Sequence, residues 1–347
     1  MNPGITFALA SAILFGISTP LAKALVATIS PLLLAGLLYA GSGLGLALVI
    51  GIRHVSTRRS FVTVPRIDEW RWLAAAIFFG GVLGPAALMY GLVTSAASTA
   101  SLLLNLEAVF TALLAWFLFN ENFDRRIALG MAAIVGSGAL LAWVPGQRGG
   151  ASLGLLLIVA ACFCWALDNN LTRKVSASDA VMVACLKGLV AGVVNIALAL
   201  VLGAKLPALP ALGAAALVGF FGYGASLVLF VLALRHLGTA RTSAYFSVAP
   251  FFGAALSLLL VGEPITWQLV AAGLLMAIGV WLHLTERHEH LHRHAPQEHS
   301  HSHVHDEHHQ HSHDSWDGAE PHSHVHRHAP LVHAHPHYPD LHHRHPH

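Results

Sequence analysis

Long apolar runs separated by short connectors dominate the first 285 residues of this chain. A helix needs about 20 apolar residues to cross a bilayer, and these runs reach that length. A soluble domain of this size could not bury them, because 55% of the residues are hydrophobic and only 10% are charged. We predict ten transmembrane helices, over residues 4–27, 31–52, 70–91, 95–119, 125–144, 152–172, 179–202, 211–234, 239–261 and 266–284.

Composition divides the chain again near residue 285. Of the 26 histidines, only His54, His236 and His283 precede that point, and the residues that follow are polar. We therefore divide the chain into a first membrane half at 1–145, a second at 146–285, and a histidine-rich tail at 286–347. We expect the tail to be disordered, because it lacks the apolar residues that a packed core requires.

One stretch of the membrane part occurs twice, since residues 98–121 align with residues 240–263 without a gap. Identical residues coincide at several positions, namely Ser101 with Ser243, Phe110 with Phe252, Ala112 with Ala254 and Glu121 with Glu263. A fainter similarity relates residues 4–23 to residues 154–173. Because each half would have five spans, the second half would enter the membrane inverted. The predicted fold is an all-α integral membrane protein of ten transmembrane helices, arranged as two inverted five-helix repeats.

Positive charges in the connectors predict the orientation, because cytoplasmic loops carry the excess of lysine and arginine. If the N-terminus is cytoplasmic, the outer connectors hold only Arg148 and Lys205. The inner connectors then hold Arg53, Arg58, Arg59, Arg66, Arg71, Arg125, Arg126, Arg173, Lys174, Arg235 and Arg241. We therefore expect both termini to be cytoplasmic.

Several of these features together resemble the EamA branch of the drug/metabolite transporter superfamily. They are the ten spans, the small and polar openings of spans four and nine, the terminal glutamates Glu121 and Glu263, and the Trp165-Ala166 pair. The resemblance covers residues 4–284 and implies a carrier of the plasma (inner) membrane, often an exporter of amino acids, metabolites or toxic compounds, that hydrolyses no ATP. The chain departs from the family at Ala108, where many relatives have proline, and in its tail.

Ionisable side chains inside membrane helices are energetically costly, so they are candidate functional groups. Glu107 lies near the middle of its span, close to Asn105. A carboxylate there could accept a proton from one side and release it to the other, which would couple a proton gradient to substrate movement. The alternative is a static ion pair with Lys23 or Lys187, which are themselves candidates for substrate or coupling-ion binding.

A second polar cluster starts at Asp168 and Asn169 in the sixth span. These side chains would either line a polar path or form the hydrated cytoplasmic end of their helix. Lys187 and Asn195 share one helix face, so they would point into a cavity or hydrogen-bond to a neighbouring helix. Tyr245 is a cavity candidate through its position in the repeat.

The tail repeats the pattern His-x-His. Our candidate metal ligands are His288, His290, His292, His294, His299, His301, His303, His305, His322, His324, His326 and His328. Alternate positions of an extended chain share a side, and imidazole suits zinc, nickel, cobalt and copper ions, so several side chains could hold one ion. The alternative is a low-complexity segment that only titrates near neutral pH. The HExxH match at 288–292 is expected by chance in such a run.

Three functions remain open at this point. The first is a secondary carrier that exports a small organic metabolite and uses the tail as a regulator. The second is a divalent transition-metal carrier with the tail as ion donor or acceptor, although the membrane part has few acids and no histidine cluster. The third is a membrane-anchored metal store or sensor without transport.

The absence of a nucleophile–base pair or a cofactor motif argues against an enzyme and against a cofactor in the membrane part. The expected partners are the lipid bilayer, a small-molecule substrate and transition-metal ions on the tail. Nucleic acid is not expected, and the sequence leaves a homodimer open.

Overall fold

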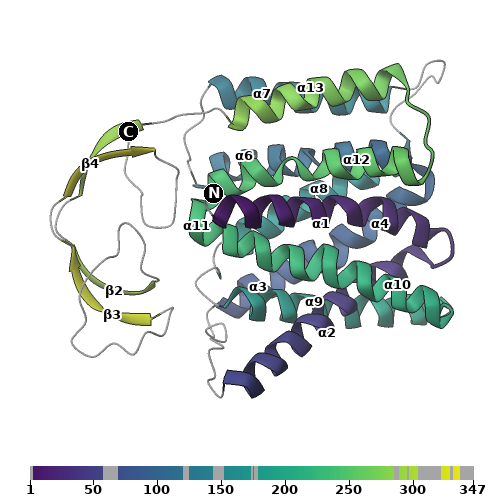
Figure 1. The fold of residues 1–347 in the computed structure, drawn as a ribbon, viewed down its shortest axis with the longest axis horizontal. Helices are drawn as coiled ribbons and strands as arrows, with labels where there is room; N and C mark the ends of the chain where they lie inside the picture. Colours follow the sequence, from purple (N-terminus) through teal and green to yellow (C-terminus); the bar gives the residue numbers. More distant parts are fainter. Residues whose placement is uncertain are drawn as a thin grey trace.

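The computed structural model describes residues 3–57, 69–119, 125–143, 152–172, 175, 179–284, 289–294, 297–303, 322–328 and 331–336. Up to Leu284 the long regular elements are helices, and the tail adds four strands (Figure 1). The helices are α1 (Pro3–Val26), α2 (Pro31–Thr57), α3 (Trp70–Ala76), the π-helix η2 (Ile77–Leu83), α4 (Gly84–Thr94), α5 (Ala97–Leu103), α6 (Leu106–Phe119), α7 (Arg125–Ala142), α8 (Leu153–Thr172), α9 (Ala180–Val201), α10 (Leu209–Gly219), the π-helix η4 (Phe220–Ala225), α11 (Ser226–Phe246), α12 (Ala249–Leu260) and α13 (Trp267–Leu284).

Seven helical stretches among the described residues are long and apolar enough to cross a membrane. They are Pro3–Val26, Pro31–His54, Trp70–Thr94, Ala97–Leu114, Leu153–Thr172, Val181–Val201 and Leu209–Ala233. Three further apolar helices are shorter, at Ala128–Ala142, Ala249–Leu260 and Trp267–Leu282. The prediction of a helical, multi-pass membrane protein is confirmed by these helices, whereas the count of ten spans stays a prediction.

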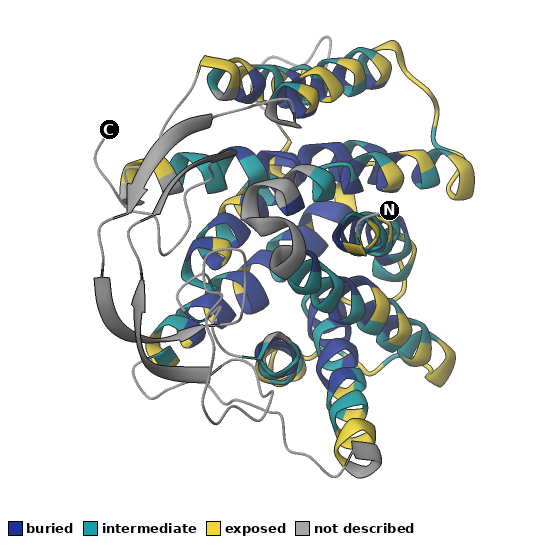
Figure 2. Cartoon of the chain, turned by 60° about the vertical axis from the view of Figure 1, so that its left-hand side comes forward, coloured by how far each residue is buried: buried dark blue, intermediate teal, exposed yellow. Residues whose placement is uncertain are grey.

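The helices of the two halves are interleaved. α2 packs along α9, α4 packs along α8, and α7 packs along α13. α1 contacts both α11 and α12, and α5 also contacts α12. The α7–α13 pair lies together at one edge of the bundle in both views (Figures 1 and 2). The core therefore lies between the halves, and each half supplies one side of it.

Burial follows the same arrangement, with buried residues where helices face each other and exposed residues on outer faces and helix ends (Figure 2). Small residues such as Ala8, Ala12 and Ala191 are fully buried. Large apolar side chains such as Leu44 and Val193 are exposed, which suits a surface in contact with lipid.

Two of the predicted spans are interrupted. In the fourth span, α5 ends at Leu103 and α6 begins at Leu106. In the ninth, α11 continues to Phe246 and α12 begins at Ala249. The predicted boundary between spans eight and nine, at residues 235–238, is therefore wrong, because that segment is helical. A new helix begins at Ala249 since Pro250 fits the first turn, where its missing N–H is not needed.

Both halves also contain one π-helical segment, η2 and η4. The ungapped alignment that pairs Glu121 with Glu263 also places η2 on η4. Phe79 and Gly80 then fall on Phe221 and Gly222. A π-helix leaves backbone groups without their regular partners and is frequent at functional sites. The equivalent positions of η2 and η4 add a structural sign of the repeat to the one in the sequence.

Four strands are described within the tail, and the disorder that we expect for the tail as a whole stays a prediction. Its strands are β1 (Glu289–His294), β2 (Gln297–His303), β3 (His322–His328) and β4 (Leu331–Pro336). They form two antiparallel pairs, β1 with β4 and β2 with β3. The same two-residue period that places alternate histidines on one side also suits an extended strand, so the all-α prediction applies to the membrane part and not to these segments.

Close contact between α2 and α9 depends on glycine at Gly188. A Cβ atom added there would lie 2.5 Å from the backbone nitrogen of Gly43. We expect Gly188→Ala to destabilise the protein by about 1–3 kcal/mol, because this overpacked contact is with backbone and cannot relax cheaply. The control is Gly213→Ala, since a Cβ at Gly213 meets nothing within 4 Å. Thermal unfolding in detergent measures the difference, and equal melting temperatures for both variants would contradict it.

Candidate functional site

Glu107 lies in the first turn of α6, immediately after the break that separates α5 from α6. Asn169 of α8 donates a hydrogen bond from Nδ2 to Oε1 of Glu107 over 2.8 Å. The same Nδ2 lies 3.4 Å from Oγ1 of Thr111, one turn further along α6. An acid of the first half therefore meets an amide of the second half, and Glu107 is only partly buried.

Asp168 and Lys187 form an ion pair between α8 and α9. Lys187 Nζ lies 2.6 Å from Oδ1 and 2.7 Å from Oδ2 of Asp168. The Lys187 side chain is 8% exposed and the Asp168 side chain is 11% exposed. Thr172 donates from Oγ1 to Asp168 Oδ1 over 2.8 Å and also lies 3.2 Å from Lys187 Nζ. These additional hydrogen bonds satisfy further donors and acceptors of the pair in a region that water reaches poorly.

The π-helix η2 brings backbone carbonyls into the same region. The carbonyl oxygen of Gly80 accepts hydrogen bonds from the Tyr39 hydroxyl at 2.7 Å and from Trp165 Nε1 at 3.0 Å. The neighbouring carbonyl of Gly81 accepts one from Asn195 Nδ2 at 3.0 Å. Side chains of α2, α8 and α9 thus satisfy carbonyls that η2 presents outside a regular α-helical pattern.

Gly80 has a second role at this place. A Cβ atom on Gly80 would lie 1.9 Å from Oδ2 of Asp168, so no other residue fits there without moving the carboxylate. Because Asp168 is followed directly by Asn169, one turn of α8 joins the buried ion pair to Glu107. The π-helix, the ion pair and the partly buried acid form one connected polar region.

Aromatic rings pack beside this polar region. Phe15 lies 6.3 Å from Trp165, 5.9 Å from Tyr223 and 5.4 Å from Phe246, measured between ring centroids. Tyr39 and Tyr223, from opposite halves, are 5.5 Å apart. These rings supply an apolar wall beside the polar groups, a combination typical of sites for small organic molecules.

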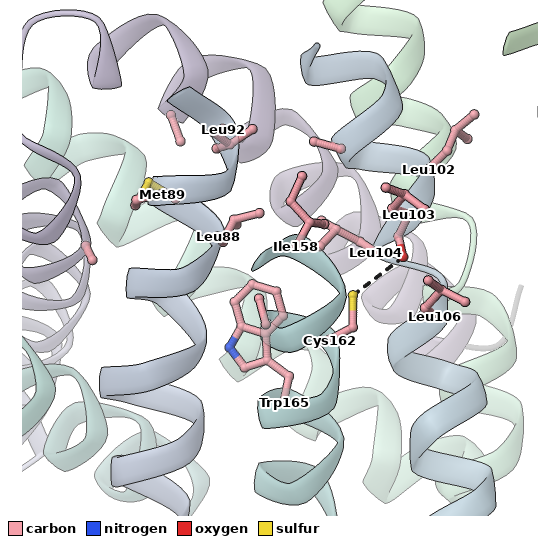
Figure 3. Close-up of a cluster of buried hydrophobic side chains, with 14 of the residues drawn as sticks. Leu88, Met89, Leu92, Leu102, Leu103, Leu104, Leu106, Ile158, Cys162 and Trp165 are labelled. Carbon is pink, nitrogen blue, oxygen red and sulfur yellow. Dashed lines mark hydrogen bonds between the residues drawn. The ribbon is translucent and has the colours of Figure 1, made fainter. Parts of the chain in front are cut away.

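The break between α5 and α6 is stabilised by α8. The Cys162 thiol points toward the break and donates to the Leu103 carbonyl oxygen at 3.5 Å (Figure 3). Asn105, at the break itself, is 3% exposed, and its Nδ2 has no hydrogen-bond partner among the described residues. The Ser101 hydroxyl, 1% exposed, is also unpartnered there. Within the described part of the chain, one polar group at the interruption and one in the last turn of α5 thus have no hydrogen-bond partner.

Of the residues that the sequence analysis selected, the structure brings Glu107 together with Asn169 and Asp168 together with Lys187. It places Lys23 elsewhere, with Nζ 2.5 Å from the carbonyl oxygen of Leu92 in α4. The ion-pair alternative required Lys23 or Lys187 to pair with Glu107. Within the described part of the chain, neither lysine does so.

Tyr245 is half-buried near the end of α11. Sequence reasoning missed Tyr39 and the carbonyl of Gly80. The signal that could have indicated η2 is the repeated Phe-Phe-Gly, at 78–80 and 220–222.

The predicted metal site can be placed only in part. His290, His292, His294, His299, His301, His303, His322, His324, His326 and His328 belong to the strands, whereas His288 and His305 lie outside the described residues. Among the residues whose side chains are described, no group of three or more histidine, cysteine or acidic side chains is arranged to hold a metal ion.

Comparison with known proteins agrees with this fold. A crystal structure of a protein superimposes with a TM-score of 0.61 at 20% identity, covering 81% of this chain and 96% of that chain. The sequence matches the EamA-like transporter family over residues 2–143 and again over residues 152–285. The chain therefore belongs to the EamA-like transporter family and contains two copies of its repeat.

Two curated relatives support the same class. An uncharacterized transporter of Methanothermobacter thermautotrophicus is 29% identical over 285 residues, which cover 78% of this chain and 82% of the relative. A probable amino-acid metabolite efflux pump of Salmonella typhimurium is 29% identical over 206 residues, covering 54% of this chain and 67% of the relative. The protein is thus a membrane transporter of this family.

The buried ion pair generates a test of stability. We expect Asp168→Asn to destabilise the protein by about 3–5 kcal/mol, because it leaves the Lys187 charge buried without its partner. The double variant Asp168→Asn/Lys187→Met should recover much of the loss, since it removes both charges. Thermal unfolding of the purified variants measures this coupling. If the two substitutions are simply additive, the pair does not act as a unit.

Proposed function

We propose that this protein is a secondary active exporter of small organic metabolites, built from two five-helix repeats of opposite orientation. The interleaved packing of the halves and the equivalent positions of η2 and η4 support the inverted arrangement. In transporters of this plan the substrate binds between the repeats near the middle of the membrane, where interrupted helices are common.

The contact between Glu107 and Asn169 carries the proposal. It joins the two repeats beside the α5–α6 break, and it involves an acid that is costly to keep inside a membrane. The second repeat has Ala249 where the first has Glu107. A residue needed only for packing would be expected in both copies of the repeat. The presence of Glu107 in one copy alone therefore favours a functional role.

In this proposal Glu107 exchanges a proton for substrate. The carboxylate binds a donor group of the substrate in one orientation of the carrier and receives a proton in the other. Asn169 holds the deprotonated carboxylate by its Nδ2 hydrogen bond and is displaced when the substrate donates in its place. The Asp168–Lys187 pair positions α8, and with it Asn169, and takes no part in the exchange.

The direction and chemistry of transport are supported by the Salmonella relative, which is described as a probable amino-acid metabolite efflux pump. An amino acid or related metabolite has an ammonium group that Glu107 could bind and an apolar part that the aromatic wall could cover. We therefore propose amino-acid-like metabolites as substrates and the plasma (inner) membrane as the location, with both termini cytoplasmic.

Substitution of Glu107 tests this function. Inside-out membrane vesicles would be supplied with the twenty proteinogenic amino acids, and an imposed pH gradient would drive their uptake. We expect the intact protein to accumulate at least one of them, and Glu107→Gln to abolish the gradient-driven part because the amide cannot release a proton. Mass spectrometry of the vesicle contents measures the difference.

The matched control is Glu69→Gln, which removes a carboxylate at the start of α3, outside the polar region. It should transport as the intact protein does. Full gradient-driven uptake by Glu107→Gln would contradict the assigned role, whereas loss in both variants would point to a general defect.

We further propose that the tail binds transition-metal ions and regulates the carrier. The strand register supports this, because histidine pairs with histidine across β2 and β3: His299 with His326, His301 with His324, and His303 with His322. Directly opposite residues of an antiparallel pair have Cβ atoms about 4.5–5.5 Å apart, a spacing that two ligands of one ion can use. Imidazole ligands suit zinc, nickel, cobalt or copper.

Deletion of residues 286–347 tests the tail. We expect the purified full chain to retain nickel or zinc after desalting, and the truncated chain to retain none, because the candidate ligands are gone. Elemental analysis measures the metal per protein. Equal metal content in both would contradict the proposal.

The alternative metal carrier can be tested separately. The intact protein and Glu107→Gln would be compared at equal expression for cellular nickel, cobalt, zinc and copper. Both keep the tail, so passive binding cancels. A reproducible difference would favour transport of the metal itself over export of an organic substrate.

A further inference from the structure

Two charged side chains bind the ends of the short connection between α4 and α5. Lys23 Nζ lies 2.5 Å from the carbonyl oxygen of Leu92 and 3.3 Å from that of Val93, in the last turn of α4. Glu263 accepts hydrogen bonds from the backbone N–H groups of Ala97 at 2.6 Å and Ser98 at 3.0 Å, in the first turn of α5.

Each charge matches the helix end that it binds. The last carbonyls of a helix carry partial negative charge and the first N–H groups carry partial positive charge, and neither set has a partner within its own helix. Lys23 therefore supplies donors to the end of α4, and Glu263 supplies acceptors to the start of α5. Only Ser95 and Ala96 separate the two helices.

The two side chains come from different repeats. Lys23 lies near the end of α1, in the first. Glu263 follows α12 in the second, directly after Gly262, whose φ of 66° ends that helix. Glu263 is 166 residues from Ala97 in sequence, so this is not a local cap like Asp179, which accepts from Val181 and Met182 at the start of α9.

The connection leads directly to the site. α5 runs from it to the break at Leu104 and Asn105, and α6 then presents Glu107. A hollow of about 600 Å³ lies beside the connection. It is lined in part by Val26, Thr28, Tyr90, Val93, Thr94 and Leu157. Val93 belongs both to this lining and to the carbonyls that Lys23 binds. The bound connection thus borders an opening at the end of the bundle where α1 ends.

We infer that Lys23 and Glu263 form a clasp across the two repeats. The clasp holds the broken helix α5–α6 in place. It also closes the path to Glu107 from the end of the bundle where α1 ends. This inference rests on the proposed transport function. Release of Glu263 from Ala97 and Ser98 frees α5 to move away from α12, which opens that end. Lys23 and Glu263 are positioning residues, and they touch no substrate.

The test measures access to α5 from each side of the membrane. Ser101 is 1% exposed and lies one turn from the clasp, so Ser101→Cys is the reporter. In its background Cys162, Cys164 and Cys185 are replaced by serine, which keeps a donor for the carbonyls of Leu103 and Gly43. A membrane-impermeant thiol reagent is applied to right-side-out and inside-out vesicles. Ser98→Cys is the second reporter if the first variant does not fold.

We expect Glu263→Gln to raise the labelling rate from one side only, by about tenfold, as loss of a charge-assisted hydrogen bond would give. Lys23→Met should act in the same direction, and the double variant should add little, because both substitutions release one clasp. Asp179→Asn removes a carboxylate from a local cap and should leave labelling unchanged from either side.

Unchanged labelling in Glu263→Gln would overturn the inference, and so would an equal increase from both sides, which would indicate general loosening. The measurement uses no substrate. Its failure would therefore leave the Glu107 assay unaffected, and failure of that assay would leave the labelling result as it stands.

Discussion

A helix that is interrupted inside a membrane presents backbone N–H and C=O groups that water cannot satisfy, so other parts of the protein must bind them. This requirement explains much of the packing in the present structure. Cys162 binds the carbonyl of Leu103 at the α5–α6 break. Tyr39 and Trp165 bind the carbonyl of Gly80 in the π-helix η2. Each of these contacts fixes the position of a helix as well as satisfying a polar group.

The two halves contribute different polar groups where these contacts meet. The first repeat supplies Glu107 and the second supplies Asp168, Asn169 and Lys187, so charged groups of unlike origin lie in one region. Gly80 leaves room for the Asp168 carboxylate. The two copies of the family's repeat thus supply different side chains to one polar region.

Much of this could be predicted from the sequence. Apolar runs indicated the membrane helices, because length and hydropathy depend only on local composition. Glu107 and Asp168 were recognisable as candidates because acids are rare inside membrane spans. Their partners were not predictable, because Lys187 and Asn169 reach them through the packing of separate helices.

Other features depended on information that a single residue pattern does not carry. The boundary predicted at residues 235–238 missed the continuation of α11, which runs without interruption to Phe246. Tyr39 gave no signal, since its role depends on where η2 lies. The tail strands were missed because composition alone predicts little apolar burial there, while strand pairing depends on register.

The interleaving of the halves has a consequence for biogenesis. When residues 1–145 have been synthesised, α2 and α7 lack the helices against which they pack, and Glu107 lacks Asn169. The first half is therefore incomplete until the second half follows it, because α2 needs α9, Glu107 needs α8 and α7 needs α13. Every helix of the first half has its packing partner only when translation has passed α13.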